Sequence, residues 1–246
     1  MRHEILRSLA GSMVGLSLLA GSSAMAADLA PAPIAPPPVF TWTGAYVTLQ
    51  VGGAWSQTST TANAGWNTSF NGAGAFGGLN VGYNLQFNSF VLGLQAEYNF
   101  AGVTGNTFAY PLGVTNSIRQ FGSVDGRLGY AFDRVLVYAI GGFAYGDIRH
   151  TMTPAIPFAT GTPGHVLDFG SSAYGWDVGG GLEYAFTNNI TARAEYRYYN
   201  FGTKGFTESV SLLGFPYHTV KETMQTARVG LTYKFGAPAA PVVARY

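Results

Sequence analysis

Three histidines are the side chains in this sequence best suited to binding a cofactor. His150, His165 and His218 all fall in or beside segments expected to be long loops. Imidazole is a common axial ligand of haem iron, so a pair of them could ligate a haem. Their spacing fits no fixed ligand motif, and a histidine in a loop is usually solvated. The sequence therefore predicts no cofactor and no metal site, with haem ligation as the alternative.

An enzymatic site would need a nucleophile or a general base beside one of these histidines. Asp147 and His150 could form such a pair at the rim of a small barrel, as a lipid A acyltransferase or deacylase would require. No nucleophile motif surrounds them. The run Gly179-Gly180-Gly181 lies within a predicted strand, where close packing explains it better than phosphate binding. We predict no catalytic residue and a protein that is not an enzyme.

The other reactive side chains are charged residues, and they lie on one face of alternating segments. In the last of these, Val229, Leu231, Tyr233 and Phe235 alternate with Arg228, Gly230, Thr232 and Lys234. A period of two indicates a strand with one apolar and one polar face. Its pattern resembles the C-terminal signal by which outer-membrane barrel proteins are recognised for assembly, which would comprise Arg228, Gly230, Tyr233 and Phe235.

Eight such segments follow the first 43 residues: Gly44–Ser56, Ala75–Gln86, Phe90–Phe100, Ser117–Phe132, Val135–Gly146, Ala173–Phe186, Ile190–Phe201 and Met224–Phe235. Each is about as long as the ~9–11 residues with which a tilted strand crosses a bilayer. Short turns alternate with long polar or Gly-rich connections, as in bacterial outer-membrane barrels. The sequence predicts an all-β fold, an eight-stranded antiparallel up-and-down transmembrane barrel. The face of the fifth strand depends on whether the turn at Asp133-Arg134 has two or three residues.

The polar faces carry the predicted lumen charge network: Glu97, Arg119, Asp125, Arg127, Asp177, Glu183, Arg193, Glu195, Arg197, Arg228 and Lys234. A soluble sandwich would show the same alternation with its charges turned outward. However, only 10% of the residues are charged, against ~25% in an average soluble protein, and 15% are aromatic. Tyr and Phe gather at strand ends, as an interfacial girdle requires. These features favour the barrel.

The flanking segments predict export. Residues 1–26 have the features of a secretory signal peptide, with a basic start, a short apolar core and an Ala-Met-Ala cleavage site. Residues 27–41 form a Pro-rich periplasmic linker, residues 42–235 the barrel, and residues 236–246 a periplasmic tail. We predict that both termini lie in the periplasm. Basic and acidic residues are balanced, so no nucleic acid partner is expected, and the absence of cysteine excludes disulfides and thiolate metal sites.

The sequence Phe40-Thr41-Trp42-Thr43-Gly44-Ala45-Tyr46-Val47, the Gly-Tyr and Tyr-x-Phe strand ends and the closing strand resemble the OmpA-like, RopB-type family of alphaproteobacterial outer-membrane proteins. The resemblance implies a major surface protein of the Gram-negative outer membrane, described as porin-like and sometimes associated with peptidoglycan or hemin. It also implies contact with outer-membrane lipid, lipopolysaccharide and the barrel assembly machinery. The tail after Phe235 departs from the wider barrel pattern, which leaves open whether Phe235 or Tyr246 is read during assembly.

An eight-stranded barrel is just wide enough for its interior to be filled by side chains. The inward acids and bases are therefore expected to pair with each other, because buried charges need partners. The alternative is a narrow ion path that opens when Arg–Glu pairs separate. The sequence predicts a structural surface protein, with porin-like passage of small solutes or hemin binding as alternative functions.

Overall fold

A computed structural model describes residues 40–62, 66–109, 112–154, 167–207 and 217–236. The predicted signal peptide, the linker before Phe40, His165 and the tail after Gly236 lie outside the described residues. The part of the chain that is described contains no helix long and apolar enough to cross a membrane.

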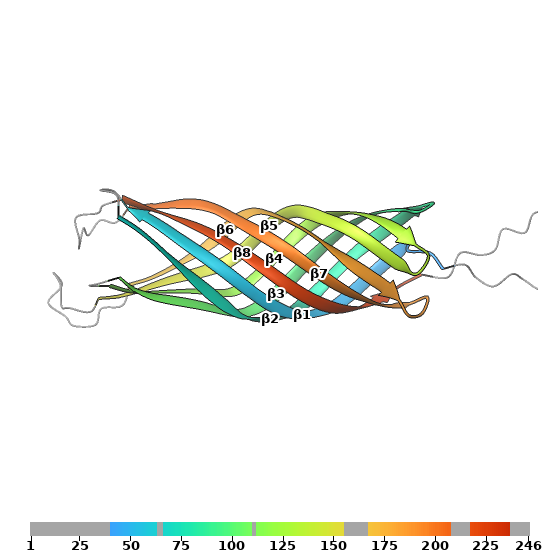
Figure 1. Cartoon of the computed structure of the whole chain (residues 1–246), viewed down its shortest axis with the longest axis horizontal. Helices are drawn as coiled ribbons and strands as arrows, with labels where there is room; N and C mark the ends of the chain where they lie inside the picture. Colours follow the sequence, from blue (N-terminus) through green and yellow to red (C-terminus); the bar gives the residue numbers. More distant parts are fainter. Residues whose placement is uncertain (1–39, 63–65, 110–111, 155–166, 208–216, 237–246) are drawn as a thin grey trace, which may run out of the picture. The chain divides into compact units, whose positions relative to one another are not determined.

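The eight strands are β1 (Gly44–Ala62), β2 (Trp66–Phe87), β3 (Phe90–Ala109), β4 (Leu112–Phe132), β5 (Val135–Pro154), β6 (Leu167–Ala185), β7 (Ile190–Thr207) and β8 (Tyr217–Lys234). Each strand pairs antiparallel with the next, and β8 pairs with β1 to close the barrel. The strands are steeply tilted around the barrel (Figure 1). The predicted fold, an eight-stranded up-and-down barrel, is confirmed.

Two of the three short connections are two-residue turns, Asn88-Ser89 and Asp133-Arg134. Asn88 and Asp133 both have a φ of 53°, a left-handed conformation that Asn and Asp tolerate because their short side chains can hydrogen-bond locally. The third connection runs through Phe186 to Asn189. The two-residue turn at Asp133-Arg134 settles the face of the fifth strand, because it pairs Val135 with Phe132 and leaves both side chains exposed on the outside.

The outward side chains form an apolar band, with exposed residues such as Leu49, Leu94 and Leu182 at its centre. Tyr184 and Phe186 border the band at the turn end, and Tyr174 and Trp176 border it at the other end of β6. A band of leucine and valine between two aromatic girdles is typical of a barrel that faces lipid. The predicted faces agree with the structure throughout this band.

The strands are longer than the sequence pattern predicts. They contain 18–22 residues where a bilayer crossing needs ~9–11, and the extra residues lie at the end away from the short turns. There β1 continues from Gln57 to Ala62 and pairs with β2 from Trp66 onward. The sequence predicts a loop here because the outward side chains, Gln57, Ser59 and Thr61, are polar. The alternation of polar and apolar residues disappears once the strand leaves the bilayer.

Arg119, which the sequence predicts to belong to the lumen charge network, lies on the outside of the barrel. The register of β4 slips between Ile118 and Gln120 where it pairs with β5, and β3 slips between Phe100 and Val103 where it pairs with β4. A β-bulge of this kind adds a residue and re-aims the side chains around it. Strict alternation places Arg119 inside the barrel, whereas the structure leaves it exposed, so this prediction is wrong.

Candidate functional site in the barrel lumen

The interior of the barrel is filled by a charged belt between two apolar clusters. Ten of the eleven side chains predicted for the lumen are buried, nine of them in this belt and Lys234 at the turn end: Glu97, Asp125, Arg127, Asp177, Glu183, Arg193, Glu195, Arg197, Arg228 and Lys234. Alternation brings them to the inner face, because in a strand every second side chain points the same way. Acids and bases are equal in number within this set of ten, which allows their charges to balance.

Arg197 of β7 is the centre of the belt. Its guanidinium lies 2.7 Å from Asp125, 3.0 Å from Asp177, 2.5 Å from Glu195 and 3.6 Å from Glu97, and all five side chains are fully shielded from solvent. These acids come from β4, β6, β7 and β3. One arginine therefore ties strands together across the barrel interior, in addition to the backbone ladder that joins neighbours.

Arg228 of β8 forms the second half of this cluster. Its guanidinium donates to Glu97 at 2.6 Å and to the hydroxyl of Tyr199 at 2.6 Å, and it lies 3.7 Å from Glu195. Gln50 donates to Glu97 at 3.0 Å and accepts from Arg193 at 2.8 Å. The acids that Arg197 binds are thus shared with other donors, as a stable buried charge requires.

A separate pair lies closer to the short turns. Arg127 donates to Glu183, which also accepts a hydrogen bond from Thr191. The guanidinium of Arg127 lies 3.6 Å from the centre of the Tyr138 ring, a distance at which a cation is attracted to an aromatic face. Tyr138 in turn donates to Glu195 at 2.8 Å. Tyr138 therefore connects the Arg127–Glu183 pair to the charged residues around Arg197.

An apolar cluster, which we call the turn-end cluster, closes the lumen near the short turns. It consists of Trp42, Val91, Ala131, Leu136, Tyr138, Ile140 and Ala185, with Phe40 packed against it. Trp42 is only 1% exposed. Its indole N–H donates to the carbonyl of Asp133 at 3.1 Å, and its backbone N–H donates to the side-chain oxygen of Gln86 at 2.7 Å.

The segment before β1 is therefore folded into the barrel mouth. Lys234, the last residue of β8, donates to the carbonyl of Thr41 and lies 4.4 Å from the ring centre of Phe40. The Phe40 ring meets Trp42 edge-on at 5.0 Å. The sequence prediction assigns Phe40 and Thr41 to the linker and overlooks this contact. The signal that could have indicated it is the pair of aromatic residues Phe40 and Trp42 shortly after a run of prolines.

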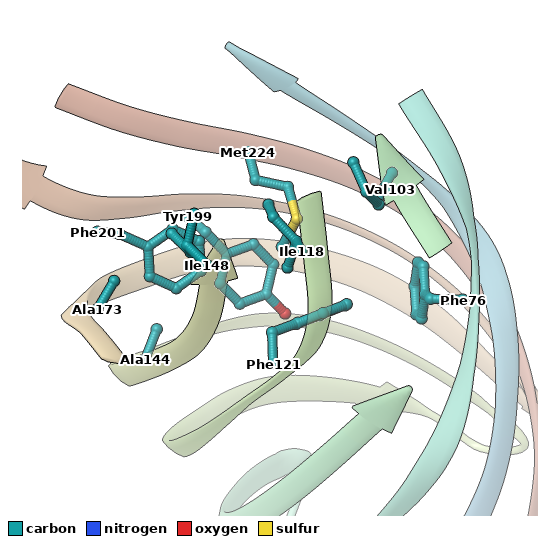
Figure 2. Packing of buried hydrophobic residues seen from close by; sticks show 11 residues of the cluster. Phe76, Val103, Ile118, Phe121, Ala144, Ile148, Ala173, Tyr199, Phe201 and Met224 are labelled. Carbon is teal, nitrogen blue, oxygen red and sulfur yellow. The ribbon is translucent and has the colours of Figure 1, made fainter. Parts of the chain in front are cut away.

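A second apolar cluster, which we call the outer cluster, fills the lumen beyond the charged belt. It contains Ala54, Phe76, Val103, Ile118, Phe121, Ala144, Ile148, Ala173, Tyr199, Phe201 and Met224. Figure 2 shows these side chains gathered on the inner side of the strands, with the Phe201 and Tyr199 rings close together. Their rings stack at 6.0 Å. The sequence prediction of a polar interior misses this layer, although its members share the inward face with the charged residues.

Glu222 of β8 lies beyond the outer cluster and outside the lipid-facing band. The exposed apolar row of β1 ends at Trp55, whereas Glu222 pairs with Thr58. Its carboxylate accepts from the Thr58 hydroxyl at 2.6 Å and from the Asn116 amide at 3.1 Å, and its other oxygen has no partner among the described residues. Burial raises the pKa of Glu222 to about 7, only partly offset by these neutral donors.

Replacing Glu222 with glutamine is expected to remove a pH dependence of stability. The folded protein holds the proton to about pH 7, whereas the unfolded chain releases it near 4.5, the ordinary pKa of a glutamate carboxyl. The unfolded state therefore binds fewer protons between these values. The free energy of unfolding should fall by about 3 kcal/mol as the pH rises through this window and stay low above it. Glu222→Gln should lack this component.

The measurement is denaturant unfolding of the refolded barrel in detergent at pH 5 and pH 8. The matched control is Lys221→Gln, which changes an exposed neighbour and should keep the full dependence of the unmodified protein. An equal change in stability between the two pH values in the Glu222→Gln and Lys221→Gln proteins would show that Glu222 does not titrate in this range.

Two of the three histidines considered for the alternative of haem ligation come from strands that are not neighbours. His150 lies in β5 and His218 in β8, and two strands of the barrel wall, β6 and β7, lie between them. His165 lies outside the described residues. Among the described side chains, no three His, Cys, Asp or Glu converge to hold a metal ion.

The predicted assembly signal is split between the two faces of β8. Tyr233 and Phe235 are half exposed on the lipid side and their rings meet at 5.0 Å. Arg228 is buried against Glu97, and Gly230 lies where a side chain would strike Thr48. The signal role itself stays a prediction.

Comparison with known proteins agrees with this architecture. Residues 14–235 match the family model described as outer membrane protein beta-barrel domain. The chain is 33% identical over 245 residues to the 31 kDa outer-membrane immunogenic protein of Brucella melitensis, covering 91% of this chain and 98% of that protein. It is 30% identical over 207 residues to the 25 kDa outer-membrane immunogenic protein of Brucella abortus, covering 83% of this chain and 84% of that one.

Among solved structures, the outer membrane protein OprG of Pseudomonas aeruginosa aligns with a TM-score of 0.46 at 10% identity, covering 79% of this chain and 98% of that one. The match to the family model spans most of the chain, and both Brucella proteins align over most of their length. The resemblance to alphaproteobacterial outer-membrane proteins is therefore confirmed. The chain belongs to the outer membrane protein β-barrel family and is a multi-pass protein of the outer membrane.

Proposed function

We propose that this protein is a structural surface protein of the outer membrane whose lumen does not conduct. The observation that carries the proposal is the Arg197 cluster, in which one guanidinium contacts four carboxylates at the centre of the barrel. The short turns would face the periplasm and the extended strand ends would project outside, as in other bacterial barrels. Recognition of β8 by the barrel assembly machinery is part of this proposal.

The way in which the interior is filled supports a sealed lumen. An eight-stranded barrel leaves room only for side chains, and here they form the turn-end cluster around Trp42, the charged belt and the outer cluster in series. A gated ion path would require the Arg197 guanidinium to separate from all four of its carboxylate partners. Leaving one buried charge without its partner costs ~3–5 kcal/mol in substitution experiments, so thermal fluctuations would open such a gate rarely.

The test is planar-bilayer recording of the refolded full chain after removal of the predicted signal peptide. We expect no stepwise current above the leak of the bare bilayer, because the three layers of buried side chains would block an aqueous path through the described part of the lumen. A wide porin reconstituted in the same way provides the positive control. Reproducible single-channel steps from the folded, heat-modifiable protein would overturn the proposal and favour porin-like passage.

A role without catalysis also belongs to this proposal. The named relatives are described as outer-membrane immunogenic proteins, which fits a structural role. Asp147 and His150, the pair with enzymatic potential in the sequence, lie on opposite faces of β5. Asp147 is one residue before the inward Ile148, and His150 is two residues beyond it. Alternation therefore directs the two side chains away from each other, which does not suit a carboxylate that must orient a histidine.

A further inference from the structure

Arg119 is a charged residue that the fold turns away from the lumen. Two facing bulges, one in β3 and one in β4, interrupt the alternation that would otherwise point it inward. Its side chain is exposed and forms no ion pair or hydrogen bond within the described ranges. Bulges re-aim side chains and often lie next to functional sites.

Its height on the barrel places it at the edge of the lipid-facing band. Gln120, the next residue, pairs with Phe100, which is 67% exposed, and accepts a hydrogen bond from the hydroxyl of Tyr98. Tyr98 and Phe100 belong to the aromatic girdle at the end of the band farther from the short turns. Arg119 therefore lies immediately beyond this girdle, at the level of the lipid headgroups.

We propose that Arg119 binds the anionic headgroup of an outer-leaflet glycolipid. A guanidinium presents a planar fork of donors that matches a phosphate or carboxylate, and the acidic groups of lipopolysaccharide lie at this depth of the leaflet. The assignment to the outer leaflet rests on the orientation given in the proposed function. The binding itself is independent of whether the lumen conducts.

Two charged residues of β5 share this surface. Asp147 pairs with Gln120, and Arg149 pairs with Ser117, so they lie beside and just beyond Arg119 on the outward face. Arg149 adds positive charge toward the outside, whereas Asp147 opposes an anion. The site thus carries two cations and one acid. Removal of the Asp147 charge should strengthen anion binding, while a purely structural Arg119 would be indifferent to it.

The experiment is native mass spectrometry of the folded full chain in neutral detergent, titrated with bis-phosphorylated lipid A. We expect Arg119→Gln to weaken the first binding event about fivefold, the loss typical of one basic residue at a membrane surface. Arg119→Lys should retain part of the affinity, and Asp147→Asn should bind more tightly than the unmodified chain. Heat-modifiable mobility confirms that each variant is folded.

Lys221→Gln is the matched control. Lys221 is also exposed and basic. The last girdle residue of β1, Trp55, pairs with Gln225, and Lys221 lies four residues farther from the band along β8. Its loss should therefore leave lipid A binding unchanged. Equal affinities for the unmodified, Arg119→Gln and Asp147→Asn chains would overturn the proposal, as would an equal loss in Lys221→Gln. Displacement of lipid A by inorganic phosphate alone would show a free-anion site and overturn the lipid assignment.

Discussion

Replacing Arg197 with methionine is expected to lower the free energy of unfolding by about 3–5 kcal/mol, because removal of one partner leaves buried charges uncompensated. Methionine fills a similar volume and introduces no new polar group. The four carboxylates around Arg197 come from four strands and are fully shielded from solvent. Arg228 and Arg193 can satisfy only part of them.

Urea unfolding of the refolded barrel in detergent measures this loss, and Arg119→Met provides the matched control. Both substitutions remove one arginine from the barrel wall, but Arg119 is exposed and has no protein partner among the described residues. Its loss should change stability by less than about 1 kcal/mol. Similar losses from the two substitutions would mean that the Arg197 cluster contributes no more than a surface charge.

Replacing Trp42 with alanine is expected to cost about 3–5 kcal/mol, the usual range for truncating a large buried aromatic residue. The change empties the centre of the turn-end cluster and removes the hydrogen bond from the indole to Asp133. It also frees the segment that Lys234 binds at Thr41, which weakens the seam between β1 and β8. The unfolding midpoint in urea should therefore shift strongly.

Trp55→Ala is the control for this prediction, because Trp55 is 52% exposed on the lipid side of β1. It should lose only an interfacial anchor, so its effect should be clearly smaller. Limited proteolysis provides a second measurement, of whether residues 40–43 stay bound to the barrel. A protease should cleave the Trp42→Ala protein near these residues while the barrel stays intact. Resistance of these residues to protease, together with a loss no larger than that of Trp55→Ala, would contradict the role of Trp42 as a closing contact.

The charged belt and the turn-end cluster together explain how this barrel reaches one arrangement. The lipid-facing side chains gain little from one another in a bilayer, because the surrounding lipid is equally apolar. Specific contacts across the lumen, such as Arg197 to Asp125 and Arg228 to Glu97, distinguish one strand register from another. A one-residue slip would carry these charges to the lipid face.

Alternation along the chain is enough to identify the strands that cross the bilayer and the face of nearly every residue in them. Polar and apolar residues alternate only where one side meets lipid and the other meets the lumen, so the pattern assigns Glu195 to the inside and Leu182 to the outside without further information. The same reasoning fails beyond the bilayer. There outward residues such as Ser59 are polar, and the pattern disappears although the strand continues.

The partners of the inward residues depend instead on how the strands are arranged in space. Alternation gives the face of a strand but neither its angular position around the barrel nor the partner across the lumen, so the four acids around Arg197 are not individually predictable. The bulge that turns Arg119 outward depends on backbone pairing between β3, β4 and β5. Trp42 seals the turn end because closure of the barrel brings Asp133 and Gln86 to it, contacts that join residues far apart in the chain.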